Sequence, residues 1–398
     1  MHGLHRIDPT HRRDGLLRIS CAAACMSGAT KQKTLAGSET MAMTKRDFLI
    51  GAAVASGGVM LSRIDASGQA GRRVIDAHTH WYPAQWVDLV QNEGEAAGAR
   101  IGRNDRGGIT FNAGGIGAVF SPNYIDLESR IKSMDETGIS AQVLSLMAPM
   151  VYWAPPAFGL KLAQSYNDAC SAAHRRYPDR FVGLAMLPMQ QPELALEELE
   201  RAGKLPGMRG VMMATAINGK NLDEKAFFPI YAKCEELGWP IFTHPVAPLG
   251  GERMSKYYLG NLLGNPVEIG IAGYSLILGG VLDAFPKLEV MLPRAGGNVP
   301  WGIMRLDRTV ERMPQLAQAK RPATIYLKRF YYDCIIESPQ IVMDLIRLVG
   351  ADRVLFGTDY PSPMRDARPT EFIQGLAELS QSERDAILGG NAARAFGL

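Results

Sequence analysis

The chain has 398 residues, of which 46% are hydrophobic, 21% charged and 8% aromatic. This composition excludes a disordered tail protein, a collagen-like fibre and a coiled coil, and it supplies ample apolar material for a large core. Residues 1–73 carry 11 Lys and Arg against 5 Asp and Glu, so the net charge of +3 comes from this segment and the remainder is mildly acidic. No Lys/Arg cluster marks the remainder as a nucleic-acid groove, so we expect no nucleic-acid partner.

The N-terminal segment has the features of a targeting signal. Residues 1–40 show no sustained apolar period and are expected to be an unstructured or untranslated leader. In the segment 41–72, a basic string at 44–47 precedes a short apolar run at 51–61, which is the layout of an export signal. It resembles a twin-arginine signal with Lys45 at the first arginine position, and predicts export to the periplasm, with a cytoplasmic location as the alternative. The run is shorter than the roughly 20 apolar residues of a stable membrane anchor.

From residue 73 to 398, short apolar runs alternate with amphipathic stretches, as in α/β proteins. Strands are predicted at Val74–Asp76, Ala141–Leu146, Phe181–Met186, Arg209–Met213, Pro240–Thr243, Leu288–Leu292, Phe330–Asp333 and Arg353–Phe356. Helices are predicted at Asp126–Thr137, Pro192–Ala202, Asp223–Leu237, Pro266–Phe285, Pro339–Leu348 and Glu371–Leu379.

Eight strands, each followed by a helical stretch, predict an α/β fold of the (β/α)8 TIM-barrel type. A doubly wound open sheet is the alternative, but no glycine fingerprint follows the first strand. The Gly-rich stretch 94–123 between the first two strands is predicted to be a long loop that forms a lid over the barrel.

Cysteines contribute little to the expected chemistry. Cys21 and Cys25 lie in the N-terminal segment, and Cys170, Cys234 and Cys334 are widely spaced through the body. This spacing fits neither a disulfide framework nor a cysteine zinc site, so the last three are expected to be buried thiols.

Four of the seven histidines lie in the body and are candidates for chemistry. His78 and His80 are two residues apart at the end of the first strand, so both imidazoles project to one face. His244 ends the fifth strand and Asp359 follows the eighth. Active sites of such barrels form at these strand ends, and three imidazoles with one carboxylate make a good site for Zn²⁺. His174 falls within a polar helical stretch and is expected to be a solvated helix residue.

Several strings in the body carry a family resemblance. They are Ile75-Asp-Ala-His-Thr-His80, Met134-Asp-Glu-Thr-Gly138, Tyr177-Pro-Asp-Arg-Phe181, Thr243-His-Pro245, Gly357-Thr-Asp-Tyr-Pro361 and Gly390-Asn-Ala-Ala-Arg394. With these, the chain resembles the amidohydrolase-related family that includes aminocarboxymuconate-semialdehyde decarboxylase and the benzoate-type decarboxylases. The resemblance implies a distorted barrel of the metal-dependent hydrolase type, and one divalent metal, usually zinc with manganese as an alternative, held by His78, His80, His244 and Asp359.

The sequence departs from this family at the end of the sixth strand. The family has a histidine there, in a His-Gly-Gly-Gly string beside the metal-bound water, whereas this chain reads Leu292-Pro-Arg294-Ala-Gly-Gly297. An arginine stays protonated and cannot act as a general base near neutral pH, but it can hold a carboxylate through two hydrogen bonds. Arg294 is therefore predicted to bind the substrate carboxylate, unless it marks a loss of function.

The family also implies where the substrate lies. Its homodimer supplies an arginine across the subunit interface, and by spacing this residue is Arg305. A second substrate arginine, expected near Ala118, is absent, and Val246 stands where the family decarboxylase has tryptophan, so aminocarboxymuconate semialdehyde itself is doubtful. Trp81 and Trp153, which follow the first and second strands, are candidates to line a flat apolar pocket.

Together these features predict a metal-dependent decarboxylase or hydrolase, with a carboxy-lyase favoured, that acts on a small unsaturated or aromatic carboxylic acid. Asp359 is expected to be both ligand and proton shuttle, and Arg294 and Arg305 to position the carboxylate. The alternative is a barrel that binds metal and small acids but is catalytically impaired, because Arg294 replaces the histidine.

Overall fold

The computed structural model describes residues 73–105 and 107–398. The predicted leader at 1–40 and the signal-like segment at 41–72 lie outside the described residues. Within the described part, no helix combines the length and the apolarity needed to cross a membrane.

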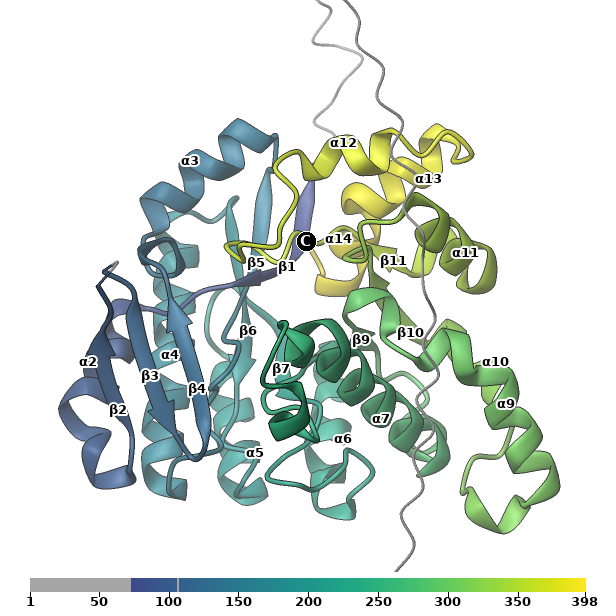
Figure 1. The fold of residues 1–398 in the computed structure, drawn as a ribbon, viewed down its shortest axis with the longest axis horizontal. Helices are drawn as coiled ribbons and strands as arrows, with labels where there is room; N and C mark the ends of the chain where they lie inside the picture. The colour runs from purple at the N-terminus through teal and green to yellow at the C-terminus, as the bar shows by residue number, and fades with distance from the viewer. Residues whose placement is uncertain (1–72, 106) are drawn as a thin grey trace, which may run out of the picture. The chain divides into compact units, whose positions relative to one another are not determined.

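Eight parallel strands form a barrel in the order of the chain, with no reversal of strand order (Figure 1). They are β1 (Ile75–His80), β5 (Ala141–Ser145), β6 (Phe181–Met186), β7 (Met208–Ala214), β8 (Ile241–His244), β9 (Val290–Leu292), β10 (Phe330–Asp333) and β11 (Val354–Leu355). Every residue of β1 and β6 is buried, as expected for strands covered on both faces. The eight predicted strands are confirmed, two of them with the predicted bounds and the others with ends shifted by at most four residues, and the sequential order excludes the doubly wound alternative.

The barrel closes where the last strand meets the first. Ala77 donates a backbone hydrogen bond to Phe356 at 2.9 Å, and His80 donates one to Tyr360 at 2.8 Å. Beyond this, a single parallel bridge joins Thr79 to Tyr360. Residues at the two ends of the described chain therefore lie side by side at this seam.

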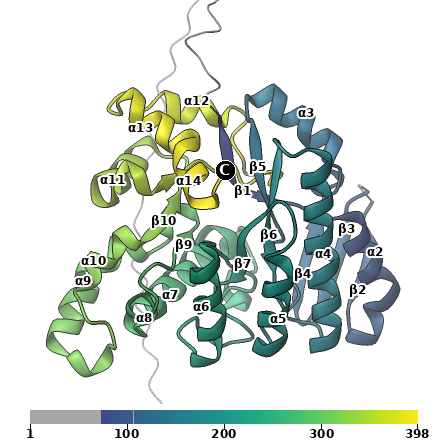
Figure 2. The ribbon, with the colours of Figure 1, turned by 180° about the vertical axis from the view of Figure 1, so that it is seen from behind.

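Helices surround the barrel and connect its strands (Figure 2). They are α2 (Ala84–Glu93), α3 (Leu127–Thr137), α4 (Pro156–Arg176), α5 (Pro192–Ala202), α6 (Phe228–Leu237), α7 (Asn265–Leu278), α8 (Val281–Ala284), α9 (Val299–Arg312), α10 (Ala323–Tyr326), α11 (Pro339–Val349), α12 (Pro369–Gln374), α13 (Gln381–Asp385) and α14 (Asn391–Phe396). The predicted helix Pro266–Phe285 is two helices, because the chain turns at Gly280, whose φ is +71°. Asp126 caps α3 by accepting from the Glu128 and Ser129 amides.

The segment predicted as a long loop is instead a three-stranded antiparallel sheet of β2 (Arg100–Arg103), β3 (Ile109–Ala113) and β4 (Ile116–Phe120). Gly114 and Gly115, at φ +56° and +77°, form the two-residue turn between β3 and β4. Positive φ at both positions is what a tight hairpin of this kind requires, so glycines that suggested a loop mark a turn. The Phe111 ring of this sheet packs edge-on against Trp153, with the centroids 5.4 Å apart.

Candidate metal centre

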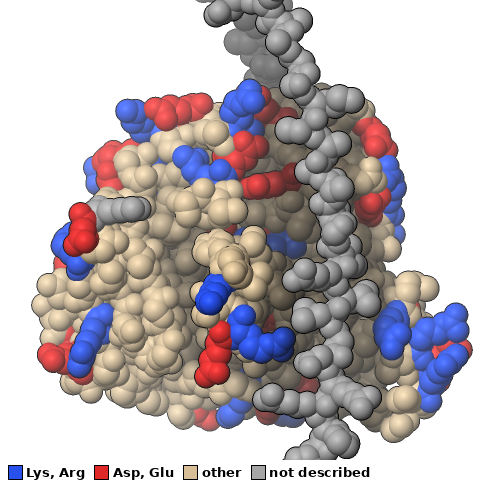
Figure 3. Space-filling view, viewed as in Figure 1, with Lys and Arg blue, Asp and Glu red and all other residues tan. Residues whose placement is uncertain are grey.

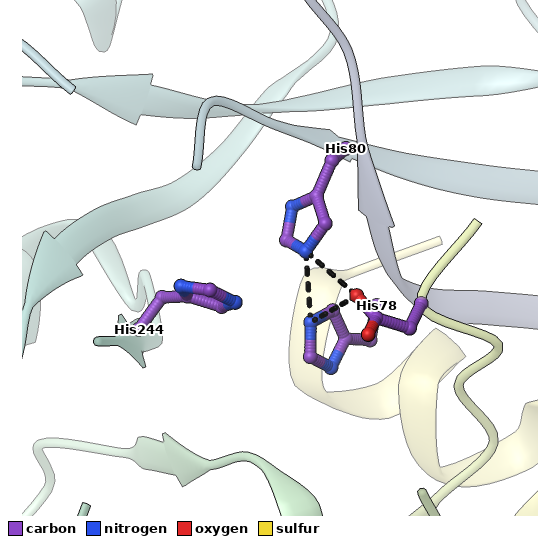
Figure 4. A group of neighbouring side chains, drawn as sticks. His78, His80 and His244 are labelled. Atoms are coloured by element: carbon purple, nitrogen blue, oxygen red, sulfur yellow. Dashed lines mark hydrogen bonds and ion pairs between the residues drawn. The ribbon is translucent and has the colours of Figure 1, made fainter. Parts of the chain in front are cut away.

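Three histidines and one aspartate converge at the C-terminal ends of the barrel strands (Figure 4). His78 and His80 lie in β1, His244 ends β8, and Asp359 follows β11. All four are buried, and one ligand atom from each lies within 4.8 Å of the others. His80 Nε2 is 3.1 Å from His78 Nε2 and 3.0 Å from Asp359 Oδ1. The four residues predicted from the sequence form a metal-binding site.

Local backbone features bring Asp359 to the histidines. A Cβ on Gly357 would meet the His78 Cβ at 2.8 Å, so only glycine lets this segment pass so close to β1. Asp359 itself has a φ of +59°, a left-handed conformation that aspartate tolerates better than most residues. Its amide donates to the His78 carbonyl at 2.9 Å, which fixes the side chain beside the two imidazoles.

The partners of the outer ring nitrogens define the tautomer of each histidine. His78 Nδ1 lies 2.6 Å from the Asp333 carboxylate, and His244 Nδ1 lies 2.8 Å from the Pro245 carbonyl. His80 Nδ1 lies 2.9 Å from Ser145 Oγ, whose own proton is donated to the Thr79 carbonyl at 2.7 Å. All three partners must therefore accept, so each Nδ1 carries the proton and each Nε2 presents a lone pair.

This arrangement fits a metal ion. The three Nε2 atoms and the Asp359 carboxylate all present lone pairs to one another, and within the described residues His244 Nε2 is buried without a hydrogen-bond partner. Lone pairs repel unless a cation lies between them. Two nitrogens bound to one tetrahedral zinc at about 2.0–2.1 Å lie roughly 3.3 Å apart, close to the 3.1 Å between the His78 and His80 nitrogens.

Protonation equilibria in the cluster favour metal binding. Burial lowers the pKa of His80 from 6.5 to about 4, despite the neighbouring Asp359 carboxylate. Burial, with the charges of the other imidazoles and Arg294, also lowers the pKa of His244 well below its ordinary value. For Asp359, burial alone would raise the pKa, but Arg294, His80 and His78 outweigh it and hold the pKa well below the usual range. Neutral imidazoles and an ionised carboxylate are the forms that bind metals.

Arg294 reaches this centre. It follows β9 in a turn where Arg294, Ala295, Gly296 and Gly297 all have positive φ. Its Nη1 donates to Asp359 Oδ2 at 3.2 Å, while Asp359 Oδ1 faces the imidazoles. The side chain is 12% exposed, and its Nε is buried without a partner among the described residues. One donor edge of the guanidinium is thus left for another acceptor.

A cavity of about 520 Å³ opens past the ends of β7 and β8, where Thr215 and Val246 line it. Tyr152, Trp153, Val246 and Ile271 supply apolar walls, and Gly114 and Ile116 of the small sheet also line it. Thr215, directly after β7, donates its amide to the His244 carbonyl at 3.1 Å. The cavity therefore adjoins the strand end that carries His244, and none of the four metal ligands lines it.

Residues 75–398 match the protein family described as Amidohydrolase. The chain belongs to this family. It is 34% identical over 328 residues to a 2-amino-3-carboxymuconate-6-semialdehyde decarboxylase of Dictyostelium discoideum, covering 81% of this chain and 91% of the relative. It is 31% identical over 296 residues to a gamma-resorcylate decarboxylase of Polaromonas sp. (strain JS666 / ATCC BAA-500), covering 68% and 87%.

A solved dihydroxybenzoic acid decarboxylase of Polaromonas sp. JS666, with bound manganese and the inhibitor 2-nitroresorcinol, has a similar fold. The TM-score is 0.68 and the identity 26%, covering 82% of this amidohydrolase and 97% of that chain. These relatives are decarboxylases of small carboxylic acids by name, and the TIM-barrel prediction is confirmed.

Other predicted residues occupy different places in this amidohydrolase. Trp153 lines the cavity, whereas Trp81 is buried, donates its ring N–H to the Ile125 carbonyl and packs on Tyr166. Arg305 is exposed on α9. His174 is half-buried, not fully solvated, because its Nδ1 bonds the Phe181 carbonyl at 2.8 Å, and it lies outside the metal cluster. Cys170, Cys234 and Cys334 are free, buried thiols, as predicted.

Sequence reasoning missed the residues that support the ligands. Asp333 ends β10 and Ser145 ends β5, so both could have been found by asking which polar residues finish each strand. Behind them, Asp76 accepts from the Thr358 amide and hydroxyl, and burial raises its pKa to about 6 against these hydrogen bonds. The fully buried Arg130 donates to the His80 carbonyl and to Gln142, a contact that only the folded structure reveals.

Proposed function

We propose that this amidohydrolase is a metal-dependent carboxy-lyase that removes CO₂ from a small unsaturated or aromatic carboxylic acid. The observation that carries the proposal is the set of three inward lone pairs and one carboxylate, with the guanidinium of Arg294 at its edge and a partly apolar cavity beside it. The names of the relatives support decarboxylation over hydrolysis. Zinc fits the donor set, and manganese, present in a related structure, is the alternative.

The chain's own residues would bind and orient the substrate. A divalent ion held by His78, His80, His244 and Asp359 would polarise the substrate or its bound water when present. Arg294 would place a carboxylate against the centre through the donor edge that Asp359 leaves free. When the C–CO₂ bond breaks, its electron pair stays on carbon, which needs a proton. Asp359 would pass a proton from water to this carbon through Oδ2, the oxygen that faces Arg294 and not the imidazoles.

Metal analysis and CO₂ detection test this function. Purified full-length protein should contain a divalent ion, and a panel of benzoic and unsaturated acids should include one that releases CO₂ only when the metal is present. Chelation should stop the release and added Zn²⁺ or Mn²⁺ should restore it. The proposal would be refuted if the purified protein contained no metal and released no CO₂ from any acid after addition of Zn²⁺ or Mn²⁺. A product formed without release of CO₂ would show that the enzyme is a hydrolase.

A second candidate function follows from the Arg294–Asp359 ion pair. A permanent cation at this place cannot act as a base and contacts a metal ligand. This geometry supports a barrel that binds metal and small acids without converting them. Such a protein would bind acids in calorimetry and give no product after long incubation, whereas any metal-dependent turnover would exclude it.

We also propose a homodimer in which Arg305 of one copy completes the site of the other. The support is that Arg305 is exposed on α9 directly after Met304 and four residues after Trp301, which are 69% and 49% exposed. In Figure 3, Lys and Arg side chains gather at the α9 end of this face. Light scattering should show a dimer, and Arg305→Ala should weaken acid binding without changing metal content; a monomer with an unchanged acid affinity would refute this proposal.

We propose export on the sequence alone, because the signal-like segment at 41–72 lies outside the described residues. N-terminal sequencing of native protein should find a start between about residues 66 and 74 in the periplasmic fraction. A native start at Met41 or Met43 in the cytoplasmic fraction would contradict it.

A further inference from the structure

A buried carboxylate of no assigned role lies in the cavity beside the metal centre. Glu268 in the first turn of α7 lines the cavity and is 4% exposed. Within the described residues, no Lys, Arg or His pairs with it. Its Oε1 accepts from the Leu249 amide at 2.9 Å, and Oε2 accepts from the Thr215 hydroxyl at 3.4 Å, the long limit of a hydrogen bond.

Each oxygen of the carboxylate has one hydrogen-bond partner and keeps a further acceptor position. An ionised carboxylate offers about four acceptor positions, of which one strong and one weak are used here. Burial of a charge with open acceptor positions is costly unless a ligand completes its hydrogen bonds.

The position of Glu268 relates it directly to the metal ligands. Thr215 contacts both the Glu268 carboxylate and, through its amide, the His244 carbonyl. A substrate held at the metal centre that extends past Thr215 would enter the cavity that Glu268 lines. The cavity walls include aromatic and aliphatic side chains of Tyr152, Trp153 and Val246, which suit a flat ring or a conjugated chain.

We propose that Glu268 determines specificity by binding a hydrogen-bond donor on the substrate, a hydroxyl or amino group distant from the carboxylate that is lost. The substrate class is thus an unsaturated or aromatic acid with such a donor. This inference rests on the proposed function and names the part of the substrate that the metal centre does not recognise. An acceptor such as a methoxy group would face the carboxylate unfavourably and be rejected.

Binding by matched benzoic acids tests the inference in the full-length protein loaded with Zn²⁺ or Mn²⁺. The probes are 3- and 4-hydroxybenzoate and 3- and 4-aminobenzoate, each compared by calorimetry with the methoxybenzoate and methylbenzoate of the same position. A hydrogen bond to a charged group corresponds to roughly 10- to 100-fold in affinity. We expect a preference of at least about tenfold for a donor at one of the two positions.

Glu268→Gln should abolish this preference and change the affinity for methylbenzoate by less than about threefold, because glutamine keeps an oxygen for the Leu249 amide and puts an NH₂ group, which cannot accept from the substrate, in place of the second oxygen. Glu252→Gln removes an exposed carboxylate nearby and should keep the preference. A wild type without preference, or a preference that survives Glu268→Gln, would overturn the inference. If acids bind and release CO₂ without preference, only this inference fails; if no acid binds, the proposed function fails with it.

Discussion

Removal of the Arg294 charge should tighten metal binding when no carboxylic acid is bound at the site. Arg294 Nη1 is 3.2 Å from Asp359 Oδ2, and the imidazoles face the other oxygen, Oδ1. An ion about 2.0–2.2 Å from Oδ1 would lie roughly 5 Å from the guanidinium. At an effective dielectric constant of 20, a divalent ion and a unit charge at about 5 Å repel by roughly 7 kcal/mol. The net effect is smaller because Asp359 lies close to both charges, and we expect Arg294→Ala to tighten metal by about 100-fold, or roughly 3 kcal/mol.

A bound carboxylate should offset the effect of the Arg294 charge on metal affinity. In the wild type, an acid placed beside Arg294 offsets the repulsion, so benzoate should raise the affinity for Zn²⁺ and Mn²⁺. In Arg294→Ala, the metal should bind tightly with or without benzoate, and benzoate itself should bind more weakly. Arg294→His should tighten metal in the empty site and raise or restore turnover of the acids that the relatives use.

Chelator competition with and without benzoate measures these affinities. Arg308→Ala, which removes one exposed positive charge from α9, serves as the matched control and should leave both affinities unchanged. If Arg294→Ala changes neither the metal nor the benzoate affinity, the side chain does not act on the site and the electrostatic argument is wrong.

Three further predictions follow from the buried groups. In Asp333→Asn, the side-chain oxygen can still accept from the Ala295 and Ile335 amides, so the new NH₂ group faces His78 Nδ1 and forces the imidazole proton onto Nε2. Chelator competition should then show a 10- to 100-fold loss of metal affinity. An unchanged affinity would contradict the assigned tautomer. His244→Ala removes a ligand, and elemental analysis should find less than about a tenth of the wild-type metal; full occupancy would place the ion elsewhere. Burial raises the pKa of Cys170 from 9.0 to about 12, so the unfolded chain releases a proton above pH 9 that the folded protein keeps, and stability falls as pH rises. Denaturant titrations should show this thiol costing about 2 kcal/mol at pH 10.5, and Cys170→Ala should lose that part of the pH dependence; an identical pH dependence in both proteins would refute it.

The barrel and its ligands were predictable because their signals are local. A buried parallel strand is a short apolar run, and a ligand at its end is a polar residue directly after that run, as at His244. His78 and His80 lie two apart, the period of a strand, so their shared direction follows from β1 alone. These patterns need no knowledge of which strands pair.

The remaining features depend on contacts between distant parts of the chain. Asp333 is 255 residues from His78, and Glu268 enters the cavity from the first turn of a helix that the sequence placed only approximately. The small sheet was missed because Gly114 and Gly115 were interpreted as loop residues, whereas the alternation of Ile109, Phe111 and Ala113 is the pattern of a strand with one buried face. Trp81 shows that a place next to a metal ligand in the sequence does not by itself put a side chain in the cavity. It directly follows His80, but its ring packs on Tyr166.

The seam of the barrel makes the metal centre dependent on completion of the chain. Asp76 and Thr358, which hydrogen-bond across the seam, are 282 residues apart, and β11 contributes only two strand residues to that edge. A nascent chain that has not yet reached Asp359 lacks one of the four ligands, so full metal affinity appears only after synthesis of the last strand. A bound ion would then link β1, β8 and the segment after β11, and would slow the opening of that edge. Amide hydrogen exchange of Ala77 and His80, which donate across the seam, should accordingly be faster in the metal-free protein than in the loaded protein, while amides in β6 change little.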